Sequence, residues 1–507
     1  MVPTIQERFQ QSPHKFFYIA AVFYCVLWML LPFLLQPNLR PDSVEKFFVG
    51  KEWLVSTAKH PTLTSAIIET AYFLTGHTPE CTYLVTGIAL FVMLWSIWKV
   101  SNLFLPPPLA LLATFASCNY RYLNIGSTFF HESIAVLPFW TLTVLLFYHA
   151  LKSEKYRYWI AAGVTCGGGL LCKYPMILLA AACFLFVLIF KETRKQSGKL
   201  CLTAFIAILI VLPHFCWNYQ HGFPTLDYLA NKGKMANPHI ADHVVSPLLF
   251  LGSQLILLLP VWLSICPVFR RAKSINQASK TEPWKHFFLG FIVLVPILLQ
   301  TAQCVFSGHR MRAGLGTHLW LFITPCLLYY LPVREPLAWK TSHLRCAFFR
   351  TGFIAVITAC CFMIHLCAEP FLSEKTGPTL FPGRELAAKT EAVWHEKFTE
   401  PIPYAAGDWI LAGNAALYGK DRPTVLPLDP KQYPGVHWAE PEDIRRCGGV
   451  ILWQIPEMTD DVNPMLPDYL RDYPSAEILA PFELKPQTRA AKPPVKIGMA
   501  LIPPKHG

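Results

Sequence analysis

Apolar stretches recur along the first 370 or so residues of the chain, and short polar segments separate them. An α-helix needs about 20 mainly apolar residues to cross the hydrocarbon core of a bilayer. Eleven stretches approach this length, at 16–36, 81–98, 104–118, 132–151, 157–172, 175–190, 200–217, 246–268, 287–306, 313–332 and 346–367. The sequence therefore predicts an α-helical polytopic membrane protein with about 11 transmembrane helices.

The composition agrees with this fold class. Of the 507 residues, 53% are hydrophobic and 15% are charged, whereas a soluble domain carries about 25% charged residues. The net charge of +12 is spread over many short clusters, which argues against a nucleic-acid partner and for loops that obey the positive-inside rule. Most of the 16 cysteines lie within apolar runs, so no disulfide framework is expected.

Prolines indicate where two of these stretches begin or break. Pro106, Pro107 and Pro108 stand near the start of 104–118, and proline is tolerated in a first helical turn because the N–H it lacks has no partner there. Lys173 followed by Pro175 favours a break between 157–172 and 175–190. A single 34-residue helix over 157–190 is the alternative.

The distribution of Lys and Arg predicts the orientation. With a cytoplasmic N-terminus at 1–15 and eleven spans, the inner segments carry 19 basic residues and the outer segments carry 10. This bias fits the positive-inside rule. An odd number of spans then places residues 368–507 outside, after a transmembrane domain at 16–367 whose first outer loop is 37–80.

The character of the chain changes at about residue 368. Proline and polar residues become frequent, and apolar stretches shorten to runs such as Gly449–Trp453 and Glu477–Ala480. This pattern favours a small extracytoplasmic α/β domain. The last twenty residues contain four prolines, at 493, 494, 503 and 504, and are expected to form an extended tail.

The first outer loop is a polar, charged segment between two apolar spans, and within it Leu39–Leu63 carries Asp42, Glu45, Lys59 and His60. Asp42 and Glu45 are spaced as in a capping box, in which Asp42 would cap a helix whose third residue is Glu45. Pro61 biases His60 towards extended backbone, so Lys59 and His60 could project from a loop or form a solvated turn. Both loci are candidate catalytic positions.

Several basic residues contradict the positive-inside rule, because Lys173, Arg310 and Arg312 fall at the outer ends of predicted spans. Charge at membrane depth is costly, so a functional role is the default hypothesis. The alternative is that the side chains snorkel to lipid headgroups. All three share the predicted side of Asp42, which favours function.

Three further outer segments contain polar candidates. His131 and Glu132 precede the fourth span, where an acid at a helix start is also ordinary. Arg121 lies in the same loop, and His221 follows the seventh span. The glycines at 167–169 lack phosphate-loop spacing and are expected to permit close packing of helices.

Several short motifs occur in one order along the chain. They are Asp42-x-x-Glu45, Lys59-His60-Pro61-x-Leu63, Leu171-Cys172-Lys173-Tyr174, Pro213-His214, Trp217-Asn218 and His221-Gly222-Phe223-Pro224. Together they resemble the bacterial branch of the protein-mannosyltransferase and aminoarabinose-transferase superfamily, which is glycosyltransferase family 39-like. The resemblance covers most of 16–335. It extends more loosely to Gly407-Asp408-Trp409, Ala412-Gly413-Asn414 and Asp421-Arg422-Pro423.

The chain departs from that family in three places. Thr62 replaces the usual second proline, and two residues separate Asp42 from Glu45, which are adjacent in the eukaryotic mannosyltransferases. His131-Glu132-Ser133 replaces an Asn- or Asp-rich start of the fourth span. These departures leave the identity of the sugar and acceptor open.

The resemblance implies a GT-C fold in a bacterial inner membrane, with a periplasmic C-terminal domain and a role in cell-envelope biogenesis. It implies transfer of a sugar from a polyprenyl-phosphate donor to a glycan, lipid or protein acceptor, with inversion. A lipid-phosphate sugar carries its own leaving group, so the site needs a base for the acceptor and cations for the phosphate. The acceptor is expected near Arg121, His131, Glu132 and His221, and membrane lipid is an expected partner.

Each candidate residue then has an expected role. Asp42 is expected to be the general base, and Glu45 to orient Asp42, hold the acceptor or join a metal site. The expected phosphate ligands are Lys59, His60, Lys173, Arg310 and Arg312.

Some members of the superfamily bind a divalent metal. The residues that could supply its ligands here are Glu45, His60, His131, Glu132 and His221. A transporter or flippase of a lipid-linked or anionic solute is the alternative function. That class predicts charges at the bilayer midplane and inverted repeats, and neither is visible in the sequence.

Overall fold

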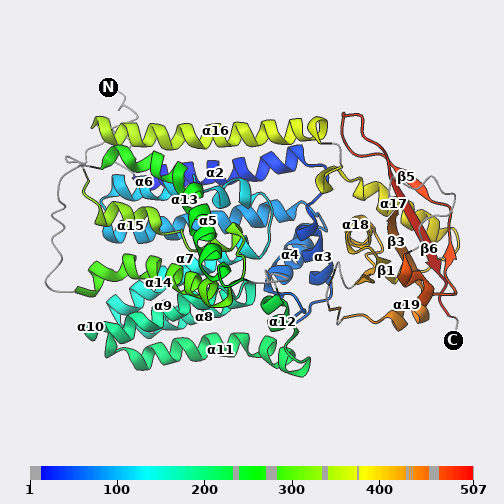
Figure 1. Ribbon diagram of the computed structural model, residues 1–507, viewed down its shortest axis with the longest axis horizontal. Helices are drawn as coiled ribbons and strands as arrows, with labels where there is room; N and C mark the ends of the chain where they lie inside the picture. The colour runs from blue at the N-terminus through cyan, green and yellow to red at the C-terminus, as the bar shows by residue number, and fades with distance from the viewer. Residues whose placement is uncertain are drawn as a thin grey trace. The chain divides into compact units, whose positions relative to one another are not determined.

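The computed structural model describes residues 13–231, 239–269, 283–333, 341–373, 376–429, 433, 435–436, 438–455 and 467–505 (Figure 1). The chain divides into two compact units, which are described here one at a time. The first, called the helical unit, comprises Met1–Leu31, Tyr83–Cys216 and Ala230–Phe362. The second, called the α/β unit, comprises Pro32–Thr82, Trp217–Leu229 and Met363–Gly507. The domain bounds predicted from the sequence remain a prediction.

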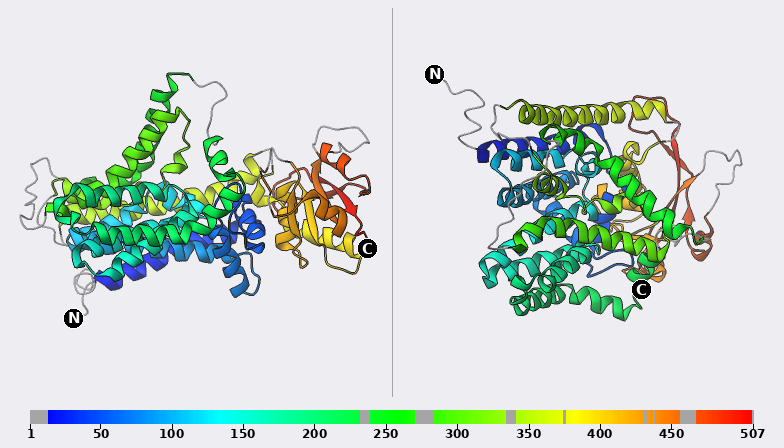
Figure 2. Two further views of the ribbon diagram at one scale, coloured as in Figure 1. Left: turned by 90° about the horizontal axis from the view of Figure 1, so that it is seen from below. Right: turned by 60° about the vertical axis from the view of Figure 1, so that its left-hand side comes forward.

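The helical unit is built from long apolar helices joined by short turns. Its elements are α2 (Pro13–Leu35), α5 (Cys81–Phe104), α6 (Pro107–Ser117), η1 (Arg121–Leu123), η2 (Ile125–Ser127), α7 (Glu132–Ser153), α8 (Tyr156–Cys172), α9 (Met176–Ile189), α10 (Lys191–Arg194), α11 (Ser197–Gln220), α13 (Asp242–Ile265), η3 (Cys266–Val268), α14 (Pro283–Ser307), η4 (Ala313–Gly316), α15 (Ile323–Tyr330) and α16 (Ser342–Leu372). Most of these helices run roughly side by side, and α13 is inclined to them (Figure 2).

Seven of the described helices are long and apolar enough to cross a membrane, and α6 and α9 are shorter apolar helices. A helix covers most of each predicted stretch except 313–332. There the prediction of a single span is wrong, because η4, a run of turns and the eight-residue α15 replace it. Gly314 and Gly316 weaken helix formation in this stretch.

The predicted break after 157–172 is present. Helix α8 ends at Cys172, and Lys173 is extended, with φ −160° and ψ 126°. Pro175 then precedes α9, and proline disfavours the helical conformation of the residue before it. Lys173 is thus held between two helices rather than on the face of one.

The glycines of α8 allow it to pack closely against its neighbours. A Cβ atom on Gly163 would lie 2.7 Å from Thr203 O of α11, and one on Gly168 would lie 2.6 Å from the Phe139 ring of α7. The prediction that the glycines serve helix packing is confirmed. Small residues of this kind let membrane helices approach each other's backbones.

The α/β unit contains a six-stranded sheet and several short helices. Its elements are α3 (Pro41–Lys51), α4 (Leu63–Leu74), α12 (Pro224–Asn231), η5 (Pro378–Leu380), α17 (Gly383–His395), β1 (Tyr404–Gly407), α18 (Trp409–Tyr418), β2 (Thr424–Pro427), α19 (Pro441–Cys447), β3 (Gly449–Ile455), η6 (Asp468–Asp472), β4 (Glu477–Ile478), β5 (Phe482–Leu484) and β6 (Val495–Ile502). A small C-terminal α/β fold is therefore confirmed.

The strand order is β2-β1-β3-β6-β4, with β5 also paired to β6. Strands β1, β2 and β3 are parallel, and β6 is antiparallel to β3. The expectation of an extended tail over the last twenty residues is wrong, because β6 is an inner strand whose residues 497–502 are buried. The prolines at 493–494 and 503–504 stand outside its ends, where they cost no ladder hydrogen bond.

Most of the predicted first outer loop is helical. Helix α3 packs against α4, where a Cβ atom on Gly50 would lie 2.6 Å from Ser65 O. It also packs against α18, where a Cβ atom on Gly413 would lie 2.8 Å from Val44 Cγ1. Two glycines therefore allow α3 to fit between an N-terminal helix and a helix of the C-terminal α/β fold.

Candidate functional site

Asp42 lies in the first turn of α3 and is exposed. The helix begins at Pro41, and the backbone carbonyl of Arg40 accepts hydrogen bonds from the N–H groups of Ser43 and Val44. No side chain caps α3, so the capping-box alternative for Asp42 and Glu45 is wrong. The Asp42 carboxylate is therefore not committed to holding the helix end.

Glu45 is one turn further along α3, and it is buried. One carboxylate oxygen lies 3.1 Å from Lys59 Nζ and the other lies 3.4 Å from Lys46 Nζ. The Lys59 ammonium also lies 3.6 Å from the centre of the Tyr433 ring and 5.4 Å from that of Trp409. Glu45 and Lys59 therefore connect α3, the following turn and the C-terminal part of the α/β unit.

The segment that carries Lys59 and His60 is a tight turn, and the Lys59 side chain in it is largely buried. Ser56 and Pro61 form an antiparallel bridge. The Thr57 hydroxyl accepts hydrogen bonds from the N–H groups of Lys59 and His60, at 3.3 and 3.2 Å. The His60 ring meets the edge of the Tyr228 ring, with centroids 5.6 Å apart.

Lys173 belongs to the helical unit. Its ammonium donates a hydrogen bond of 2.6 Å to the hydroxyl of Ser133, in the first turn of α7. The next residue, Tyr174, shares a 2.7 Å hydrogen bond between its hydroxyl and Nε2 of the buried His214 on α11. A half-buried cation and two polar side chains thus meet where α7, α8, α9 and α11 are close.

Arg310 and Arg312 lie in the segment between α14 and η4, and both are exposed. Arg121 is exposed on η1. Within the described parts of the chain, no carboxylate forms an ion pair with any of these three guanidinium groups. Their charge is therefore available to an anionic ligand.

The remaining candidates take part in local contacts. His131 is the N-cap residue of α7, its Nδ1–H donates to Phe129 O at 3.1 Å, and Glu132 begins the helix. The Nδ1–H of His221 donates to Trp217 O at 2.7 Å, and its ring stacks on Trp217.

The candidate metal ligands are divided between the two units. Glu45, His60 and His221 belong to the α/β unit, whereas His131 and Glu132 belong to the helical unit. No group of three His, Cys, Asp or Glu side chains with a suitable arrangement occurs among the described residues. The metal ligands suggested by the sequence therefore stay a prediction.

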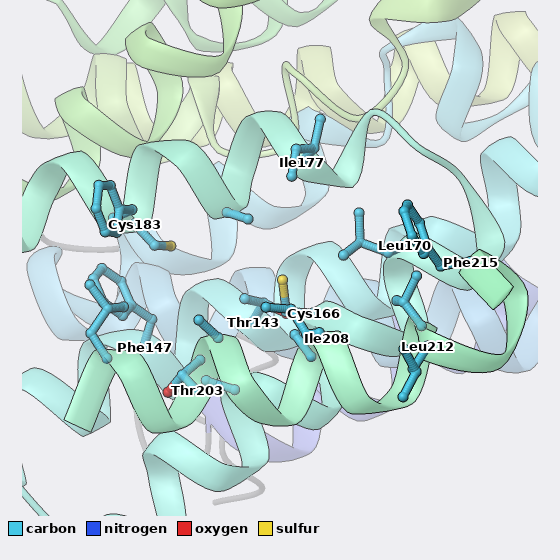
Figure 3. A pocket seen from close by; sticks show the side chains of 17 residues that line it. Thr143, Phe147, Cys166, Leu170, Ile177, Cys183, Thr203, Ile208, Leu212 and Phe215 are labelled. Carbon is cyan, nitrogen blue, oxygen red and sulfur yellow. The ribbon is translucent and has the colours of Figure 1, made fainter. Parts of the chain in front are cut away.

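The helical unit contains an apolar groove of about 570 Å³ between α7, α8, α9 and α11 (Figure 3). Phe147 and Cys183 lie at one end, and Leu170 and Phe215 lie at the other. Several lining side chains are exposed, among them Ile208 at 63%, so the groove opens to the surface of the helices. Leu170, at its second end, precedes Lys173 by three residues in the sequence.

An ion pair that sequence reasoning missed ties α4 to the C-terminal fold. The Arg422 guanidinium forms hydrogen bonds of 2.9 and 3.0 Å with the two carboxylate oxygens of Glu69, and it lies 4.4 Å from the centre of the Tyr72 ring. Lys51 donates a hydrogen bond to the carbonyl of Arg422, and burial lowers the pKa of Lys51. The motif Asp421-Arg422-Pro423 gave the only sequence signal.

Comparison with known proteins identifies relatives of this chain. Residues 59–217 match the family described as dolichyl-phosphate-mannose-protein mannosyltransferase. The chain is 26% identical over 331 residues to the lipopolysaccharide core galacturonosyltransferase RgtB of Rhizobium johnstonii. This match covers 63% of the chain, and the chain spans 62% of the length of that relative.

Two solved structures share the fold. The crystal structure of ArnT from Cupriavidus metallidurans bound to undecaprenyl phosphate aligns with a TM-score of 0.61 and 12% identity, covering 97% of this chain and 98% of that one. The apo state of the same protein aligns with a TM-score of 0.58 and 11% identity, over 96% and 97% of the two chains. With the family match, these likenesses agree with the resemblance carried by the motifs: the chain has a GT-C-type fold and is similar to glycosyltransferases of the protein-mannosyltransferase and aminoarabinose-transferase kind.

Proposed function

We propose that the protein transfers a sugar from a polyprenyl-phosphate donor to an acceptor of the cell envelope, on the outer face of a bacterial inner membrane. The observation that carries the proposal is the Asp42 carboxylate on α3, which is exposed and caps no helix. Two relatives support the classes of donor and acceptor. ArnT was solved with undecaprenyl phosphate, and RgtB acts on the lipopolysaccharide core. The acceptor here is a lipid A or core glycan, another glycan or a protein.

The proposed reaction needs one base. The acceptor oxygen forms a bond to the anomeric carbon while the bond from that carbon to the phosphate oxygen breaks, with inversion. Asp42 takes the acceptor's proton, and the polyprenyl phosphate leaves with the electron pair of the broken bond. Glu45 is the weaker candidate for the base, because it is buried and two ammonium groups already occupy its oxygens.

The leaving phosphate needs cations. Lys173, Arg310 and Arg312 are proposed to supply them, since arginine favours bidentate contact with phosphate and lysine acts as a point charge. Lys59 is less suited to the primary role, because Glu45 compensates its charge. Lys59 and His60 are proposed to assist from the turn that follows α3.

Lys173→Met is expected to raise the KM for the donor by about 10- to 100-fold, because a charge-assisted hydrogen bond contributes about 1.5–3 kcal/mol. The value is measured from initial rates over a range of donor concentrations. Lys152→Met is the matched control, since Lys152 is exposed at the end of α7. A change in Lys173→Met no larger than that of the control would remove Lys173 from the phosphate site.

The groove in the helical unit is proposed to hold part of the prenyl tail, because it is apolar, opens to the surface of the helices and includes Leu170, three residues before Lys173 in the sequence. Ala204→Trp places a ring in this groove, from an exposed lining position on α11. The KM for a long-chain donor is expected to rise about tenfold, in line with the loss of roughly 50 Å² of apolar contact at 25 cal/mol per Å².

A short-chain donor provides the internal comparison for this groove variant. Its KM is expected to change much less in Ala204→Trp, because its tail does not fill the groove. Leu209→Trp adds the same ring at an exposed position on α11 that does not line the groove. Equal effects of the two tryptophans, or equal effects on long and short donors, would contradict the assignment.

The experiment that tests the function as a whole is turnover of a panel of polyprenyl-phosphate sugars by the purified protein in detergent, with envelope glycolipids as acceptors. Formation of a glycosylated acceptor together with release of polyprenyl phosphate is the expected result. Binding of the donors without turnover of any of them would overturn the proposal. Movement of the lipid across liposome bilayers without transfer would instead support the transporter alternative.

A further inference from the structure

A second cavity, polar where the groove of the helical unit is apolar, lies within the α/β unit, between the end of α4 and the helices α17 and α18. Its volume is about 420 Å³, and its walls carry three basic side chains, two tyrosines and a histidine. They are Arg384, Lys420, Arg422, Tyr72, Tyr418 and His77. None of them belongs to the proposed transfer site.

The two arginines of this cavity are held in place before any ligand arrives. Arg422 forms a two-point ion pair with Glu69 and lies over the Tyr72 ring. Arg384 pairs with Glu80 and lies 4.7 Å from the centre of the Tyr418 ring. Side chains fixed in this way lose little conformational freedom when they bind a ligand.

One basic side chain of the cavity has no ion-pair partner among the described residues. Glu69 and Glu80 balance the two arginines, whereas Lys420 is exposed and has no ion-pair partner in the described parts of the chain. In addition, the buried Nε of Arg422 has no hydrogen-bond partner there. An oxyanion could therefore bind here without displacing either carboxylate.

Two further carboxylates lie near the cavity, and both are already hydrogen-bonded. Glu391 accepts a hydrogen bond of 2.9 Å from the N–H of Asp421. Asp421 in turn pairs with His395 at 2.9 Å and accepts a hydrogen bond from the N–H of Ile402. Both carboxylates are engaged in holding the turn that carries Lys420 and Arg422.

The backbone of the cavity wall is strained at two positions. His77 has φ 66° and Arg422 has φ 49°, and they are two of the five non-glycine residues with positive φ among those described. Such residues are uncommon, and they concentrate at ligand-binding and active sites.

Apolar side chains next to the cavity indicate what carries the anion. Phe73 and Leu74 end α4 just before His77, and they are 69% and 78% exposed. Large exposed apolar side chains beside basic ones are typical of segments that lie in the headgroup region of a bilayer. The combination fits an anionic group attached to a lipid better than a soluble anion.

We propose that this cavity binds the phosphate group of an amphiphile, through Lys420 and Arg384, while Phe73 and Leu74 contact its apolar part. It is a lipid-phosphate site separate from the one assigned to the sugar donor. Because it can be tested by binding alone, it does not depend on the proposed transfer activity.

The test uses native mass spectrometry of the full-length protein in neutral detergent, titrated with dioleoyl phosphatidic acid. Lys420→Glu is expected to weaken the tightest phosphatidic acid binding at least about tenfold, because it replaces a charge-assisted contact by repulsion. Lys420→Arg is expected to bind within about twofold of the wild type, since it keeps the charge. Lys389→Glu, on exposed α17 surface, is the control and is also expected to stay within about twofold.

Two further ligands test whether the site needs both the phosphate and the apolar part of the amphiphile. Dioleoylglycerol, which has the same tails and no phosphate, is expected not to compete, and inorganic phosphate is expected to compete only at concentrations at least about 100-fold higher. If thermal melting shows that Lys420→Glu and the wild type are both folded, and the two bind phosphatidic acid equally, the proposed site is wrong. Inorganic phosphate that competes as well as phosphatidic acid would overturn the amphiphile as its ligand.

Discussion

Asp42→Asn is expected to lower the kcat of sugar transfer by about 10²- to 10⁴-fold, which is the usual contribution of a general base. The amide keeps the size of the side chain but cannot take a proton from the acceptor. Because Asp42 is exposed and caps no helix, the substitution should leave the melting temperature unchanged. The KM for the donor is expected to stay within about twofold, since no role in donor binding is assigned to Asp42.

The measurement compares steady-state transfer by the wild type and the variant at saturating donor and acceptor. Glu385→Gln is a matched control, because Glu385 is an exposed acid in the first turn of another helix, α17. It is expected to transfer at the wild-type rate. An Asp42→Asn enzyme that keeps more than a tenth of the wild-type kcat would show that another group takes the proton.

Glu45→Gln separates the two carboxylates of α3. This change removes the charge that Lys59 and Lys46 share, in a buried setting, so its main expected effect is on stability. Loss of transfer with unchanged stability in Glu45→Gln, and not in Asp42→Asn, would reverse the roles proposed here.

The membrane helices were predictable because their signal is local. About 20 apolar residues in a row have few alternatives to a spanning helix, so helix positions follow from hydropathy. The clearest disagreement, at 313–332, lies where glycines interrupt the apolar run and Gly316 packs against Gln254 of α13. That contact joins residues far apart in the sequence, and hydropathy does not report it.

The fold of the C-terminal segment was harder to predict. Strand β6 consists of one apolar stretch between pairs of prolines, and by itself it resembles a tail. Its identity depends on pairing with β3, from Gly449↔Ile502 to Ile455↔Lys496. Such a pairing is a non-local contact, and a single sequence contains no direct record of it.

The candidate site likewise combines features that are local in the sequence with contacts between residues far apart in it. The exposure of Asp42 follows from its place after Arg40 and Pro41 at a helix start, which is local. The ion pair between Glu45 and Lys59 closes a turn of 14 residues, and the pair between Glu69 and Arg422 joins residues 353 positions apart. The roles of Lys173, Arg310, Arg312 and the other candidates stay predictions, because they concern bound substrates.

Arg422→Gln is expected to lower the free energy of unfolding by about 3–5 kcal/mol, which is the usual cost of removing one partner of a buried ion pair. The Glu69 side chain is only 8% exposed, so its carboxylate would lose its counter-ion without gaining water. The stacking of the guanidinium on Tyr72 is lost as well. The effect is measured as a shift of the tryptophan-fluorescence melting curve of the purified protein.

A surface pair is the control for this prediction. Arg446 pairs with Asp443 three residues earlier, and its side chain is 74% exposed. Arg446→Gln is expected to change stability by less than about 1 kcal/mol, as for other exposed pairs. If Arg422→Gln and Arg446→Gln have the same melting temperature, the contact between α4 and the C-terminal fold does not stabilise the protein.

A double variant distinguishes the loss of charge from the loss of packing. In Glu69→Met combined with Arg422→Met, no buried charge is left unpaired, and apolar side chains of similar length fill the space. Replacement of both partners of a buried pair is often neutral, so the double variant is expected to recover most of the stability lost in Arg422→Gln. If it melts as low as the single variant, the two-point geometry of the ion pair itself holds α4 against the sheet, and hydrophobic packing cannot replace it.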